Sequence, residues 1–172
     1  LFMNSMYAVD AYVRDYFRKA VLDALLAEKL PVTVFGEGWE KYSCGDEHSL
    51  RREPAVPFAL SFERIAKAHV LLNVSPIFNR GMHDRVPAGM ANRAVVLTDE
   101  NPYLRRTFTD GKELLFYSLE KPDTLCEQAE RALTDVRLRE KIAASAYETF
   151  EREYTWKHRV EQILAFAEEV EA

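Results

Sequence analysis

The 172-residue chain contains few cysteines and no long apolar run. Its two cysteines, Cys44 and Cys126, are far apart and form no CxxC pair, which excludes a disulfide framework and suits a reducing compartment. No apolar stretch approaches the roughly 20 residues that span a bilayer. No basic and apolar leader follows Leu1, so the sequence shows no signal peptide. We therefore expect a cytoplasmic location and no transmembrane segment.

An excess of positive charge is also missing. The chain has 23 basic and 28 acidic residues and a net charge of −5, which argues against nucleic acid as a partner. Residues 112–172 contain 14 acidic and 9 basic residues, so the net negative charge lies entirely in that part. By contrast, five arginines and only three acidic residues lie between residues 80 and 106. This segment is expected to be locally positive.

Motifs of serine hydrolases, zinc proteases and P-loop NTPases are absent from the sequence. Cys44, Asp46, Glu47 and His48 form one compact set of polar side chains. A structural zinc site commonly uses two closely spaced pairs of ligands, and no second pair exists here. The set is better interpreted as a solvated loop, and we expect no metal site.

What the sequence does contain is a regular alternation of short apolar runs and amphipathic segments. Strands that alternate with helices are typical of a parallel α/β sheet. We predict a Rossmann-like, doubly wound parallel sheet with helices on both faces and a helical C-terminal tail, in one domain over residues 1–172. The expected strands lie within residues 32–39, 70–74, 94–98 and 113–117. The expected helices lie at 7–28, 58–69, 121–134, 136–150 and 155–171, with a loop and helix over 75–93, a short helix from Asn101, and mostly loop over 40–57.

Ligands of such a sheet bind at the carboxyl ends of the strands, where three loops are candidates. In the first, Gly36 and Gly38 would let a ligand approach the backbone closely, although such a pair is more often only a turn. In the third, Asn101 followed by Pro102 is explained by a helix start. Asp99 in that loop is the side chain that we least expect to serve only as a cap.

The second loop, between two apolar strands, is the strongest candidate. Gly81 would let an anion approach the N–H groups at a helix start, and the flanking basic side chains would neutralise it. The alternative is that Asp84 caps the helix and Arg85 pairs with a surface acid. A polar cluster at the ligand edge of the sheet favours a diphosphate site. The candidate binding residues here are Asn73, Arg80, Gly81, His83 and Arg85.

Several motifs in a fixed order resemble a known family. They are VFGEGW, GMHDRV, MANRAVVLTD, NPYL, DGKELLFY and TWKHR. Together they resemble the carboxyl-terminal, donor-binding domain of group 1 retaining glycosyltransferases, in the branch related to spore-maturation proteins. The resemblance covers nearly the whole chain. It implies the second half of a two-domain GT-B architecture, so we expect a fragment that lacks an upstream acceptor-binding domain.

The resemblance implies a hexosyltransferase that uses a nucleotide-diphosphate sugar and needs no metal or other cofactor. The acceptor would be a glycan, a protein or a lipid held by the other domain, and transfer would retain the anomeric configuration. The diphosphate would lie at Gly81, with catalytic candidates His83, Asp84 and Arg85. The nucleotide base would pack near Phe58. On its own the fragment is expected to bind nucleotide weakly and to be inactive.

Three positions differ from the usual family pattern. Arg80 and Ala88 stand where many group 1 enzymes have glutamates, one near the transferred sugar and one at the ribose. Arg93 stands where glycine usually ends the small-residue segment. The ribose contact is therefore open, and Asp84 and Asp99 are the nearby acids. An alternative interpretation is a non-catalytic α/β regulatory or interaction module derived from the same fold.

Overall fold

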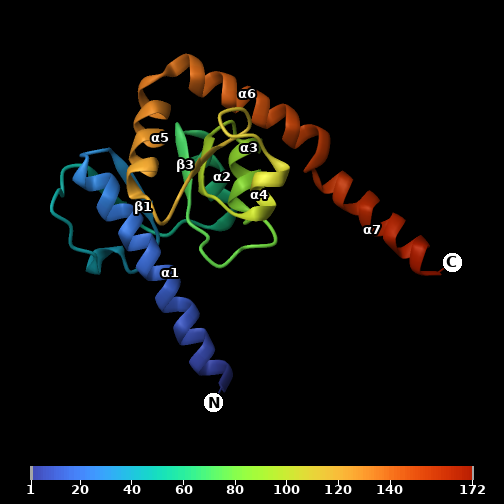
Figure 1. The fold of residues 1–172 in the computed structure, drawn as a ribbon, viewed down its shortest axis with the longest axis horizontal. Helices are drawn as coiled ribbons and strands as arrows, with labels where there is room; N and C mark the ends of the chain where they lie inside the picture. Colours follow the sequence, from blue (N-terminus) through green and yellow to red (C-terminus); the bar gives the residue numbers. More distant parts are fainter. Residues whose placement is uncertain (1, 172) are drawn as a thin grey trace.

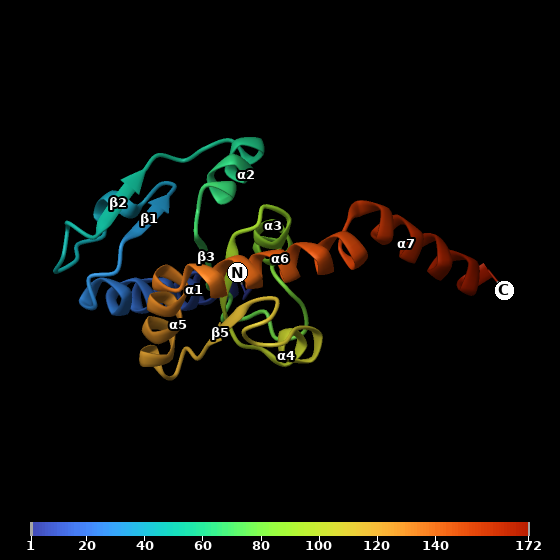
Figure 2. The same ribbon diagram turned by 90° about the horizontal axis from the view of Figure 1, so that it is seen from above.

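The structure is a computed structural model that describes residues 2–171, with side chains described for residues 6–170. Two parallel sheets form within this range. The smaller pairs β1 (Val32–Phe35) with β2 (Leu50–Glu53), and the larger has the order β3-β4-β5. Figure 2 shows the β1–β2 pair to one side of the larger sheet. The strands of the larger sheet are β3 (Val70–Asn73), β4 (Val95–Asp99) and β5 (Leu115–Tyr117).

Helices cover both sheets, and long helices extend from the body at both ends of the chain (Figure 1). The helices are α1 (Phe2–Ala27), α2 (Phe58–Ala66), α3 (Arg85–Ala91), α4 (Pro102–Thr107), α5 (Pro122–Thr134), α6 (Val136–Glu153) and α7 (Trp156–Glu171), with one 3-10 turn, η1 (Trp39–Lys41). Within residues 2–171, no helix is both long and apolar enough to cross a membrane. The predicted α/β fold with parallel strands is confirmed, although its strands pair as two sheets.

The larger sheet separates two apolar cores, which explains why helices are needed on both of its faces. On one face, Leu97 packs with Val21 of α1 and with residues of α5 and α6. On the other face, Val96 packs with Met90 of α3 and with residues of α4. Every residue of β4 is buried, because successive strand side chains point to opposite faces and both faces are covered.

Two predicted elements need correction. Residues 40–57 are mostly loop, as predicted, but they also contain β2, which the prediction lacked. Its charged sequence hides the strand, which is held by Leu50 in the core and by Arg52, whose Nε donates to the Trp39 carbonyl oxygen at 3.0 Å. The first helix starts at Phe2 and not at residue 7. Its first half projects from the body, so Val9 is 57% exposed although its helical spacing predicted a buried face.

The turn from α3 to β4 explains the arginine that replaces a family glycine. Arg93 has a left-handed φ of 57°, a conformation that favours glycine. Its N–H donates to the Met90 carbonyl oxygen at 3.2 Å, and the Ala94 N–H donates to the Gly89 carbonyl oxygen at 3.1 Å, as in a Schellman motif. The Arg93 guanidinium lies 4.0 Å from the centre of the Tyr147 ring, which offsets part of the backbone cost.

Gly89 lets α3 pack closely against β4. A Cβ at this position would lie 2.4 Å from Cγ2 of Val96 and 3.0 Å from Cδ2 of Leu71. We expect Gly89→Ala to lower the free energy of unfolding by about 2 kcal/mol, because Val96 is stiff and buried. Urea unfolding followed by circular dichroism measures this change. Gly45→Ala is the control, since a Cβ there meets nothing within 4 Å; equal stability of both variants would contradict the expectation.

Candidate functional site

Asn73, at the carboxyl end of β3, is the centre of a buried polar cluster. Its Nδ2 donates to Oγ1 of Thr98 at 3.0 Å. Its Oδ1 accepts from Oγ of Ser75 at 3.2 Å and from Nη1 of Arg85 at 3.1 Å. The Tyr117 hydroxyl donates to its backbone oxygen at 2.9 Å. The fully buried Asn73 therefore joins the ends of three strands and positions the Arg85 guanidinium.

Asp99, at the carboxyl end of β4, anchors the loop that follows β3. Its Oδ1 accepts from the Ser75 N–H at 2.7 Å, and the residue is only 3% exposed. Burial raises the pKa of Asp99 to about 6, while the bond from Ser75 acts in the opposite direction. Burial, and then the charge of Asp99, also raise the pKa of Tyr117. This edge of the sheet is thus poorly hydrated.

Asp84 occupies the N-cap position of α3, but the side chain that accepts from the first turn belongs to His83. The His83 Nδ1 accepts from the Arg85 N–H at 3.2 Å, whereas the Asp84 side chain makes no cap hydrogen bond. The His83 Nδ1 also contacts the Asp84 carboxylate, but one nitrogen cannot accept and donate at once. Burial and the Arg85 charge lower the pKa of His83, which favours the neutral ring.

Positive charge on α1 acts on this cluster, and the sequence analysis did not predict it. Phe17 and Val21, on either side of Arg18, line a small gap together with Tyr117 at the end of β5. Burial lowers the pKa of Arg85, and the positive charge of Arg18 lowers it further. Nothing in the sequence of α1 distinguishes Arg18 from its other charged residues, because this effect depends on the tertiary fold.

The loop over residues 75–84 is held in place by Asn101. Its side chain accepts from the Leu104 N–H at 2.7 Å, which confirms the predicted helix cap. Its Nδ2 donates to the carbonyl oxygens of Phe78 at 2.7 Å and of Gly81 at 3.2 Å. Gly81 itself has no left-handed φ, and a Cβ there would meet only the Phe78 ring at 3.6 Å. Any need for glycine at this position would come from a ligand and not from the fold.

Five of the predicted binding residues, Gly81 among them, make no hydrogen bond or ion pair with the Asn73 cluster among the described residues. Gly36 and Gly38 have φ angles of 122° and 90°, and Gly38 precedes η1, so turn geometry accounts for both. Phe58 begins α2, is 73% exposed, and contacts Phe62 edge-on. Arg80 is exposed in the loop before α3. The structure therefore brings together Asn73, His83, Arg85 and Asp99, with Gly81 and Asp84 in the same loop.

The polar side chains around Cys44 make hydrogen bonds and ion pairs with one another and with Arg52. Glu47 accepts from Sγ of Cys44 at 3.4 Å and pairs with Arg52, while Asp46 accepts from the His48 N–H at 3.1 Å. Over the part of the chain that the structure describes, no three His, Cys, Asp or Glu residues could hold a metal ion together.

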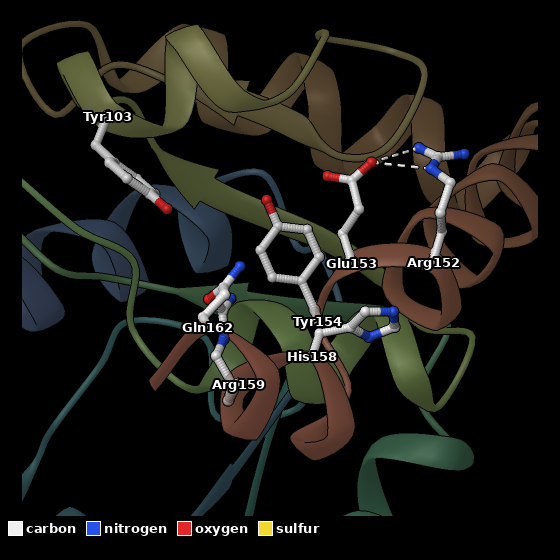
Figure 3. A pocket seen from close by; sticks show the side chains of 7 residues that line it. All are labelled: Tyr103, Arg152, Glu153, Tyr154, His158, Arg159 and Gln162. Atoms are coloured by element: carbon white, nitrogen blue, oxygen red, sulfur yellow. Dashed lines mark hydrogen bonds and ion pairs between the residues drawn. The ribbon is translucent and has the colours of Figure 1, made fainter. Parts of the chain in front are cut away.

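A groove lies elsewhere, between α4 and the junction of α6 with α7 (Figure 3). Its volume is about 300 Å³. Its polar side chains already bond to one another. Nε of Arg152 donates to Glu153 at 2.9 Å, and Nη1 of Arg159 donates to Gln162 at 2.7 Å. Unlike Arg152, Arg85 forms no ion pair with a carboxylate among the described side chains. We therefore place the candidate site at the edge of the larger sheet.

A comparison with protein families identifies the family of this chain. The sequence profile of glycosyl transferase-like proteins matches residues 14–165. The chain belongs to this family. The predicted glycosyltransferase resemblance is thus confirmed, whereas the spore-maturation branch stays a prediction. A comparison with the curated proteins finds no match.

Solved structures of glycosyltransferases share the GT-B type of fold. HepE of Anabaena in complex with UDP-glucose has a TM-score of 0.72 at 12% identity, over 87% of this chain and 44% of that one. Its complex with UDP has a TM-score of 0.73 at 12% identity, with the same coverage of both chains. A glycosyltransferase from Rickettsia africae has a TM-score of 0.63 at 10% identity, over 91% of this chain and 54% of that one. The chain thus spans less than half of the length of HepE.

Proposed function

We propose that this domain binds the diphosphate of a nucleotide-sugar donor and takes part in transferring the sugar to an acceptor. One observation carries the proposal. The Arg85 guanidinium lies partly buried at the carboxyl ends of β3 and β4, held by the Asn73 side chain at 3.1 Å. Among the described side chains, no carboxylate forms an ion pair with it. A partly buried, unpaired guanidinium at the ligand edge of a parallel sheet is suited to bind an anion.

The chemistry of sugar transfer needs such a group. Breaking the bond between the sugar and the diphosphate leaves an oxocarbenium-like sugar and increases the negative charge on the departing phosphate. Arg85 would stabilise that charge, and the neighbouring His83 ring would contact the donor. UDP-glucose in the similarly folded HepE supports a nucleotide sugar as the ligand class. The proposal includes no metal ion.

The other parts of the proposed activity rest only on the resemblance to group 1 glycosyltransferases. They are retention of the anomeric configuration, transfer of a hexose, and an acceptor glycan, protein or lipid that a second domain would bind. The contact to the ribose is also open. Ala88 lies in α3, and its methyl group offers no hydrogen-bond acceptor. The Asp99 carboxylate already accepts a hydrogen bond from the Ser75 N–H.

Direct binding tests the proposal. The folded chain should bind uridine diphosphate or guanosine diphosphate with a dissociation constant below millimolar, measured by titration calorimetry or ligand-observed NMR. Circular dichroism confirms that the sample is folded. If neither nucleotide binds at millimolar concentration, the proposal is wrong and a non-catalytic module with the same fold is favoured.

A further inference from the structure

We propose that α7 is a dimerisation helix, which packs in the antiparallel direction against the α7 of a second copy of this chain. Figure 1 and Figure 2 show α7 projecting from the body, and every residue from 160 to 170 is exposed. None of the residues assigned to donor binding lies in α7, so the inference is independent of the proposed function.

The apolar residues of α7 form one continuous stripe along the helix. Their spacing alternates between four and three residues, which is the heptad repeat of helices that pair along their length. The stripe consists of Trp156, Val160, Ile163, Ala167 and Val170. Its four larger side chains are 51% to 84% exposed in the single chain. The stripe thus faces solvent in one copy, whereas a second helix would bury it.

The charges of α7 follow an order that does not suit an isolated helix. Lys157 and Arg159 lie near its start, whereas Glu168 and Glu169 lie near its end. A helix dipole favours the opposite order, with acidic side chains at the N-terminus and basic ones at the C-terminus. Lys157 contacts Glu161 at 3.9 Å, but both side chains are exposed and such a pair contributes little. A partner of complementary charge would therefore stabilise this helix.

A second α7 in the antiparallel direction has that complementary charge. It brings the acidic end of one helix against the basic start of the other, and it sets the two helix dipoles in opposite directions. The groove of Figure 3 lies at the same basic start, and its lining includes Arg152, His158 and Arg159. Parallel pairing would instead place like charges together at both ends. Two identical antiparallel helices are related by a two-fold axis, so the contact closes as a dimer.

A membrane surface suits α7 less well as the occupant. Amphipathic helices that lie on membranes have Lys and Arg in excess on their polar face, because the lipid surface is often anionic. Residues 156–170 contain three acidic and two basic residues. The polar residues of α7 thus have no excess of positive charge for such a surface.

Sedimentation velocity of the unchanged chain at a series of concentrations tests the proposal. We expect a monomer at roughly 1 µM and a dimer at roughly 100 µM, because a helix pair of about two heptads is a small interface. Ile163→Glu, in the middle of the stripe, should raise the dissociation constant of the dimer at least about tenfold. Ala165→Glu is the control, since it adds the same charge to an exposed position on the opposite side of α7. The control should dimerise as the unchanged chain does.

Charge reversal tests the direction of pairing. The double variant Glu168→Lys with Glu169→Lys places basic residues at both ends of α7, so it should raise the dissociation constant of an antiparallel dimer about tenfold. Adding Lys157→Glu and Arg159→Glu reverses the whole charge order and should restore the dimer. In a parallel dimer, by contrast, the first double variant would change nothing, and that result would overturn the antiparallel arrangement.

Two further outcomes would overturn the inference. One is a folded chain that stays monomeric over the whole concentration range, and its binding to vesicles of phosphatidylcholine and phosphatidylglycerol would then identify a membrane as the occupant. The other is an equal effect of Ile163→Glu and Ala165→Glu on the dimer. Nucleotide binding should be the same in both of these variants, so the donor site stands or falls by its own test.

Discussion

Arg85→Ala is expected to weaken nucleoside diphosphate binding by about 10- to 100-fold, because it removes charge-assisted hydrogen bonds to the phosphates. Binding of the nucleoside without phosphate should change little, since the guanidinium at the end of β3 would face the phosphates and not the base. Titration calorimetry with uridine diphosphate and uridine, or with the guanosine pair, measures both affinities. Arg85→Lys should retain part of the diphosphate affinity through its charge.

Arg137→Ala is the control for this prediction, because it removes an exposed arginine from α6. Both ligands should bind this variant as they bind the unchanged chain. If Arg85→Ala lowers diphosphate and nucleoside binding by the same factor, its effect is structural and the assignment of Arg85 to the phosphates is wrong.

Asp99→Asn is expected to make stability less dependent on pH. Burial raises the pKa of Asp99 in the folded chain from 3.8 to about 6, so the folded state holds the proton more tightly than the unfolded state does. Stability is therefore highest below the unfolded pKa and declines as pH rises through the folded pKa. The free energy of unfolding should fall by about 2 kcal/mol between pH 4 and pH 7 relative to Asp99→Asn. The asparagine keeps an oxygen to accept from Ser75.

Urea unfolding at several pH values measures this difference. Glu100→Gln serves as a control for the loss of one negative charge at the same edge, because the Glu100 side chain is partly exposed and pairs with Arg105. If the unchanged chain and Asp99→Asn keep a constant difference in stability from pH 4 to pH 7, Asp99 is ionised throughout and its burial has been misjudged.

The larger sheet could be predicted because its strands carry strong local signals. β3 and β4 are apolar runs, and both faces of the sheet are covered, so neither strand needs alternating polar residues. The cap at Asn101 could be predicted because it depends on neighbouring residues only. β2 could not, because its four residues include Arg51 and Arg52, and only pairing with β1 makes them a strand.

The candidate site likewise contains some features that could be predicted from the local sequence and others that could not. Asn73, His83 and Arg85 could be predicted because they lie between the end of an apolar strand and the start of the next helix. The role of His83 as a helix cap could not, since histidine is not among the usual capping residues. The effect of the Arg18 charge on Arg85 could not be predicted, because it depends on how α1 packs over the sheet. Long-range packing of this kind leaves no local mark in the sequence.

A crystal structure of the chain with a bound nucleoside diphosphate tests the central claim most directly. It should show a phosphate within hydrogen-bond distance of the Arg85 guanidinium, at the carboxyl ends of β3 and β4. Phosphates bound away from Arg85, for example beside Arg152 or Arg159 in the groove of Figure 3, would contradict the account.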